Sequence, residues 1–345
     1  MKYIISILLI MHLALPTFGA EYTAPEVPYE AQDFMPESND FLEGLTAMLK
    51  KVLLKLRPDL AEANGVFLGL VGISVIFGLL GAVSGFISFP MELCGAASTA
   101  SVLLLSTNSL IRLGTNTITQ LTEYGKLLLP VMTAALAAQG GVTTSGALYA
   151  GSTLFISLLS HLIAKILIPG IYLYLVFSIG AAATAQKSLL GFRDMLKSGI
   201  SWCLKIILTI FTSYISITGI VSGATDAAAL KATKVTISSF VPVVGGILSD
   251  ASEAVLISVS LAKNAAGIYG IFAILAVFLH PFLKIGMHYL VLKASCAVCS
   301  LLGPKSITDL IQDFSTAMGI LLAMTGAICL MLLISTVCFL RGVGA

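Results

Sequence analysis

The sequence predicts an all-α protein that crosses a membrane several times, and three observations lead to this fold class. Of the 345 residues, 57% are hydrophobic and only 10% are charged, whereas a soluble domain carries about 25% charged residues. The mean hydropathy is +1.01. The apolar residues also form long uncharged runs, which suit membrane helices, instead of the short alternating segments of a membrane barrel. This composition excludes a water-soluble globule, a disordered tail, a disulfide scaffold and a nucleic-acid-binding protein.

The charges divide the chain into three parts. Residues 1–20 begin with Lys2, continue through an apolar run and end in small residues after Pro16, which is typical of a secretory signal peptide. An uncleaved anchor is the alternative. Residues 21–64 carry nine acidic and four basic side chains, and we expect an extracytoplasmic arm followed by an amphipathic helix. Residues 65–345 form the expected helical transmembrane domain.

The amphipathic helix is predicted from apolar residues at helical spacing with basic residues between them, and it should end before Pro58. Three placements are open for it. The helix lies on the membrane surface, packs on a partner, or packs on the body of the protein itself.

Uncharged runs of roughly 20 residues or more predict about 7–9 membrane helices when the broken or re-entrant elements are included. The runs lie at 63–91, 93–111, 127–164, 166–186, 206–225, 264–283 and 314–340.

The run at 127–164 is too long for one ordinary span and carries a polar interruption. Pro130 lies in its first arm, and Gln139, Gly140 and Gly141 begin a stretch of glycine and hydroxyl residues. We therefore expect a broken or re-entrant element, with a first arm of about 12 residues that is short for a crossing. A single helix with a flexible middle is the alternative. These four residues are structural or gating candidates.

A second broken or re-entrant element is expected at 238–264. Pro242, Gly245 and Gly246 interrupt any regular helix there. A new helix is then predicted from Asp250 at the cap and Glu253 three residues later, which suits the helix dipole. The candidates for helix capping or partner binding in this segment are Asp250, Glu253, Lys263 and Asn264.

Sidedness follows from basic residues near the ends of spans. The densest basic stretch holds Lys187, Arg193, Lys197 and Lys205, and we place it in the cytoplasm. The acidic N-terminal part and residues 226–263 then lie outside, and we expect Arg341 inside.

The sequence contains none of the familiar catalytic motifs for metalloproteases, serine hydrolases or nucleotide binding, so we expect no enzymatic activity, cofactor or metal. Cys296 and Cys299 form the one paired thiol motif, but zinc needs four ligands and no second pair exists. Small thiols in the core are the better interpretation.

His280, Lys284 and His288 are spaced four residues apart, which places them on one face of a helix. Ionisable groups inside a membrane usually face protein or water, so they form a possible polar stripe along an aqueous path. The alternative is a helix end at which Lys284 reaches the membrane interface.

Two stretches together resemble the stage III sporulation protein AE family of endospore-forming bacteria. They read LLLPVMTAALAAQGGVTTSGALY at 127–149 and KATKVTISSFVPVVGGILSDASEAVLISVSLAKNAAGIYG at 231–270. The second is the more specific and contains the expected family positions Pro242, Gly245, Ser249, Asp250, Glu253, Lys263, Asn264 and Gly267. The signal-like start, the acidic head and the total length also fit.

The resemblance implies a multi-pass protein of the mother-cell membrane that surrounds the forespore, with its N-terminus extracytoplasmic after signal cleavage. It implies a membrane subunit of the mother cell–forespore channel, or feeding tube, that supports endospore formation and late forespore gene expression. The implied partners are other proteins of the same sporulation operon, among them an ATPase and ring-forming subunits, and a forespore membrane partner. No enzymatic residues are implied.

Two other functions remain open on the residues alone. A stand-alone secondary transporter or permease would use the two broken helices at its centre. An intramembrane hydrolase would use Ser145 with a distant His, but the spacing matches no known nucleophile motif.

Overall fold

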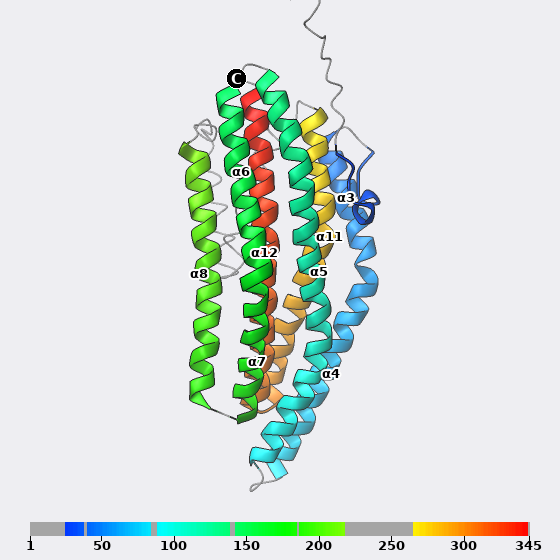
Figure 1. The fold of residues 1–345 in the computed structure, drawn as a ribbon. Helices are drawn as coiled ribbons and strands as arrows, with labels where there is room; N and C mark the ends of the chain where they lie inside the picture. The colour runs from blue at the N-terminus through cyan, green and yellow to red at the C-terminus, as the bar shows by residue number, and fades with distance from the viewer. Residues whose placement is uncertain are drawn as a thin grey trace, which may run out of the picture.

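The computed structural model describes residues 25–37, 40–83, 88–138, 142–184, 186–217 and 265–343. Within these ranges all regular secondary structure is helical, which confirms the predicted all-α class. Six long rods lie side by side and alternate in direction (Figure 1). They are α4 (Arg57–Val83), α5 (Ser88–Ala138), the continuous rod of α6 (Val142–Leu162), the π-helix η1 (Ile163–Leu167) and α7 (Ile168–Thr184), then α8 (Lys187–Ile217), α11 (Ala265–Leu302) and α12 (Lys305–Val343).

All six rods in the described part of the chain are long and apolar enough to cross a membrane. This confirms a polytopic membrane protein. The bundle is, however, taller than a bilayer. At about 1.5 Å per residue, α12 is about 58 Å long and α5 about 76 Å, against about 30 Å for the hydrocarbon core.

The alternating directions give the bundle two different ends. At the hairpin end, α4 leads into α5, α7 into α8, and α11 into α12; at the C-terminal end, α5 leads into α6 and α12 finishes (Figure 1). Arg341 lies in the last turn of α12, at the opposite end from the basic start of α8. The expectation that Arg341 lies on the same side as the basic stretch is therefore wrong. The reason is that α11 and α12 together return the chain to the end at which α11 begins.

Helix α12 fills the axis of the bundle. It contacts α5, α6, α7, α8 and α11, and 94% of its apolar stretch is buried. Two glycines of α5 allow the close approach: a Cβ at Gly114 would lie 2.8 Å from Leu321, and one at Gly125 would lie 2.5 Å from Leu332. The centre of a single chain is thus occupied by packed side chains.

The N-terminal arm packs against the same bundle. It contains the short helix α2 (Tyr29–Gln32) and the predicted amphipathic helix, α3 (Phe41–Lys55). Asp40 caps α3 by accepting a hydrogen bond from the backbone N–H of Leu42 at 3.3 Å. The inward face of α3 buries Met48 and Val52 completely. Of the three open placements, the structure has the helix packed on the protein's own body.

The predicted break near 127–164 is present, because α5 ends at Ala138 and α6 begins at Val142. Its arms are not short, however. Residues 127–138 are the end of the 51-residue helix α5, and Pro130 lies inside that helix. The helix continues through Arg112, a residue that we expected to bound a span. Gln139, Gly140 and Gly141 lie outside the described residues.

The second predicted break, at 238–264, also lies outside the described residues. The expectations for Pro242, Gly245, Gly246, Asp250, Glu253, Lys263 and Asn264 therefore stay predictions.

Candidate functional site

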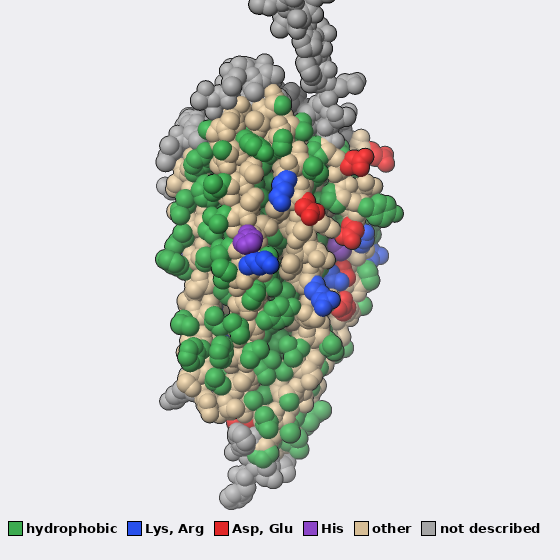
Figure 2. Space-filling model, viewed as in Figure 1, with side chains coloured by type: hydrophobic (Ala, Val, Ile, Leu, Met, Phe, Trp, Pro, Cys, Tyr) green, Lys and Arg blue, Asp and Glu red, His purple; other side chains and the backbone are tan. Residues whose placement is uncertain are grey.

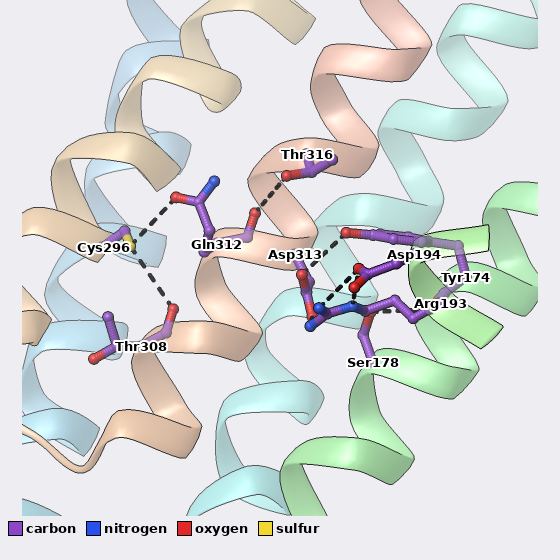
Figure 3. Close-up of polar contacts among 9 residues, drawn as sticks. All are labelled: Tyr174, Ser178, Arg193, Asp194, Cys296, Thr308, Gln312, Asp313 and Thr316. Carbon is purple, nitrogen blue, oxygen red and sulfur yellow. Dashed lines mark hydrogen bonds and ion pairs between the residues drawn. The ribbon is translucent and has the colours of Figure 1, made fainter. Parts of the chain in front are cut away.

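A buried ionic cluster joins α7, α8 and α12 near the hairpin end (Figure 3). Asp313 of α12 is its centre. One carboxylate oxygen of Asp313 accepts a hydrogen bond from Arg193 Nη1 at 2.9 Å, and the other accepts one from the hydroxyl of Tyr174 at 3.0 Å. Three helices from distant parts of the chain thus share one carboxylate.

Arg193 links this interior group to the surface. Its Nε and Nη2 donate to the same oxygen of Asp194, at 3.0 and 2.8 Å. The side chains of Arg193 and Asp313 are 17% and 11% exposed, whereas that of Asp194 is 61% exposed. The guanidinium therefore connects the bundle interior to its surface, and its planar donors fit two acceptors at once.

The cluster forms one wall of a polar cleft of about 320 Å³. Three basic and three acidic side chains line the cleft, so its formal charge is balanced. They are Arg193, Lys197, Lys305, Asp194, Asp309 and Asp313. Ionisable side chains inside a membrane bundle are costly and usually serve a path or a switch. This arrangement holds α8 against α12 through the Arg193–Asp313 ion pair.

A second set of polar contacts ties α11 to α12 beside the cluster (Figure 3). The thiol of Cys296 donates to the Gln312 side-chain oxygen at 3.5 Å and to the Thr308 carbonyl at 3.7 Å. Cys299 is buried, and its thiol donates to the Leu70 carbonyl. Both thiols pack between helices, and no three His, Cys, Asp or Glu side chains of the described residues are placed to hold a metal ion.

A separate ionic cluster fastens the start of α4 to the middle of α11. Lys284 Nζ donates to Asp59 Oδ1 at 2.6 Å and lies 3.6 Å from Glu62 Oε2. His280 Nε2 lies 3.5 Å from Asp59 Oδ2, and its ring stacks on Phe34 of the N-terminal arm with centroids 5.6 Å apart. This cluster thereby holds the arm and α4 on the bundle.

Of the three members of the predicted polar stripe, His280 and Lys284 share Asp59, whereas His288 has separate surroundings. Lys284 and His280 face α4 and the arm, and Lys284 lies well inside α11 instead of at a helix end. His288 is buried, and its Nδ1 lies 3.0 Å from the Lys284 carbonyl. Within the described residues, the structure gives Lys284 and His280 contacts between helices.

The sequence analysis did not find the Asp313 cluster. Asp313 served there only to bound an uncharged run, and Arg193 only to set sidedness. The available signal was the pair Asp309 and Asp313, four residues apart and so on one face of a largely apolar helix. The partners of Asp313, which are Arg193 and Tyr174, lie 120 and 139 residues away in the sequence. Local sequence patterns do not indicate that pairing.

Comparison with known proteins assigns the chain to a family. The family model for stage III sporulation protein AE matches residues 39–342. The chain belongs to this family. A curated relative, stage III sporulation protein AE of Bacillus subtilis (strain 168), is 26% identical over 237 residues.

That alignment covers 68% of this chain and 59% of the relative, so it spans well under two thirds of the relative's length. No solved structure matches the chain. Family membership implies a role in sporulation. The multiple apolar helices make it a membrane protein.

Proposed function

We propose that the protein is a membrane subunit of the channel, or feeding tube, that links the mother cell to the forespore and sustains late forespore gene expression. The observation that carries the proposal is the match of the sporulation family over residues 39–342 on a chain whose described part has six apolar rods. The proposed location is the mother-cell membrane around the forespore, with the N-terminus outside the cytoplasm. The proposed role is non-enzymatic.

The filled axis of the bundle supports a subunit role over a self-contained pore. Because α12 occupies the centre of one chain, a passage would have to run between chains, either copies of this one or other proteins of the same operon. The proposed partners are an ATPase and ring-forming subunits on one side and a forespore membrane protein on the other.

The experiment is affinity purification of the full-length, tagged chain from sporulating cells in a mild detergent, read by mass spectrometry. The proposal expects the ATPase and ring-forming proteins to co-purify, and expects deletion of the gene to abolish spores. A tagged, unrelated multi-pass protein made at the same stage is the control. Purification without those partners, from cells that still form normal spores, would contradict the proposal.

A stand-alone secondary transporter is the second candidate, and the Arg193–Asp313 pair beside a polar cleft favours it. Intramembrane ion pairs often mark the path of a coupled ion or proton. This candidate expects the purified chain alone to move a solute across vesicle membranes, which the channel-subunit proposal does not.

A further inference from the structure

Five basic side chains, each from a different rod, lie near the middle of the bundle's height. They are Arg57, Arg112, Lys165, Lys205 and Lys284, and we call them the basic belt. Four of them are exposed, and only Lys284 forms an ion pair within the described part of the chain. Figure 2 shows that the charged side chains of the visible face gather at and above mid-height, over a lower half covered largely by hydrophobic side chains.

Contacts with α12 place two members of the belt at one height. Gly114 of α5 and Gly286 of α11 pack on the neighbouring residues Leu321–Leu322 of α12. Arg112 and Lys284 each lie two residues from these glycines along their own helices. Their heights therefore differ by less than about one and a half helical turns.

The other members are placed by contacts between neighbouring rods. Gly170 of α7 packs on Ile200 of the antiparallel α8, with a Cβ there 3.3 Å from the Ile200 side chain. Lys165 lies five residues before Gly170 and Lys205 five residues after Ile200, so the two lysines are level.

Two hydrogen bonds connect this pair and Arg57 to the rest of the belt. Tyr172 of α7 donates to Asn108 of α5 at 2.8 Å, which sets Lys165 level with residue 115, within a turn of Arg112. The ion pair between Lys284 and Asp59 brings Arg57, two residues away, to the same level. The five cations thus lie at a similar height on five different rods.

Along α12 and α7, the distance from the belt to the hairpin end is close to the thickness of the hydrocarbon core. Between Lys305 and Leu322, α12 rises about 26 Å, and between Lys165 and Thr184 the rod rises about 29 Å. The hydrocarbon core is about 30 Å thick. One half of the bundle therefore suffices to cross the membrane.

The side chains that α4 and α5 expose on this half suit lipid. The apolar stretch of α4 is only 11% buried and exposes Leu68, Ile76 and Leu79. Leu105 of α5 is 81% exposed. A row of exposed leucines and isoleucines against water would be costly, whereas against acyl chains it is neutral.

The other half suits water along two of its faces. Beyond the belt, the exposed positions of α5 include Asn116, Thr119, Glu123 and Lys126. Helix α3, whose exposed face carries several charges such as Lys50, covers α11 at this height. A continuous polar face does not lie against acyl chains.

The one tryptophan of the sequence, Trp202, lies three residues before Lys205 and is exposed. Tryptophan prefers the membrane–water interface, and lysine and arginine near span ends extend towards the phosphates.

We propose that the basic belt lies at the lipid phosphates of one leaflet, so that the bilayer occupies only the half of the bundle between the belt and the hairpin end. The other half, with α3, the end of α5 and the start of α6, projects about 30 Å from the membrane. This inference does not depend on the proposed sporulation role.

Two thiol probes on α5 test the inference with a matched pair. The six native cysteines are first replaced by alanine. Leu105→Cys and Thr119→Cys then place thiols on the same face of α5, about 21 Å apart along the helix. The chain is reconstituted in vesicles of phosphatidylcholine and phosphatidylglycerol. A charged methanethiosulfonate is supplied on both sides by freezing and thawing, and such a reagent enters hydrocarbon poorly.

The proposal expects Thr119→Cys to be labelled, and Leu105→Cys to be labelled only after detergent is added. Leu158→Cys is the control for an alternative arrangement, in which only the polar face of α5 contacts water and the rest of this half lies in lipid. Leu158 is an exposed apolar residue of α6, level with residue 122 of α5, and it too should be labelled. Protection of Thr119→Cys or Leu158→Cys, or labelling of Leu105→Cys without detergent, overturns the proposal.

Trp202 provides an independent measurement on the unmodified chain. Lipids brominated near the headgroup should quench its fluorescence more strongly than lipids brominated near the end of the acyl chain. Stronger quenching by the deep bromines, or no quenching by either lipid, overturns the placement of the belt at the phosphates.

Discussion

Replacing Arg193 by Met should destabilise the bundle because it leaves the Asp313 carboxylate buried without its cation. In the native chain, Arg193 donates to this carboxylate at 2.9 Å. Removing one partner of a buried pair costs about 3–5 kcal/mol. Because the pair borders a polar cleft, we expect the low end, about 3 kcal/mol, which corresponds to a fall of about 6 °C in Tm at about 2 °C per kcal/mol.

The double variant Arg193→Met/Asp313→Leu tests whether the loss comes from the unpaired Asp313 carboxylate or from the lost contacts of the Arg193 side chain. It removes both charges, and apolar replacement of a buried pair is often neutral, so its Tm should return to within about 2 °C of the native value. The assay is thermal unfolding of the purified chain in detergent. Asp194→Asn, at the exposed partner of Arg193, is the matched control and should cost at most about 1 kcal/mol. A double variant as unstable as Arg193→Met would refute the reasoning.

Three further predictions concern the Asp59–Lys284 ion pair, the close packing at Gly78 and the predicted second break at Gly245. Asp59→Lys and Lys284→Asp should each lower the Tm of the purified chain, while the combined exchange restores most of it; no recovery would show that the 2.6 Å contact matters little. Gly78→Ala should cost about 1–3 kcal/mol because its Cβ would meet backbone at the end of α11, whereas Gly72→Ala, with open space around it, should not; equal Tm values would contradict this. Gly245→Leu should reduce co-purification of the sporulation partners, and unchanged recovery of those partners counts against the predicted second break.

The sequence was sufficient to predict the all-α polytopic class, because long apolar runs bounded by charge favour membrane helices; it predicted about 7–9 of them, and the described residues hold six candidate spans. It predicted separate elements at 93–111 and 127–138, whereas the structure has the single helix α5 across both. The prediction treated each charge as a span end. Because the bundle is taller than the bilayer, α5 continues past Arg112. A charge in such a helix marks a change from lipid to water around it and does not mark the end of the helix.

The Asp313 cluster illustrates what local patterns cannot predict. Asp313, Arg193 and Tyr174 come from three helices, and their meeting depends on how α7, α8 and α12 pack. In the same way, the spacing of His280, Lys284 and His288 gave no indication of Asp59, which lies 225 residues from Lys284. A spacing identifies a face, and only tertiary packing identifies what that face contacts.

The central claim is that α12 fills the axis of the described bundle, so that these helices of one chain enclose no passage. Its most direct test is efflux of small solutes from vesicles that hold on average less than one purified chain each. The account predicts no efflux above that of empty vesicles. Efflux that rises in proportion to the fraction of vesicles holding a single chain would contradict it.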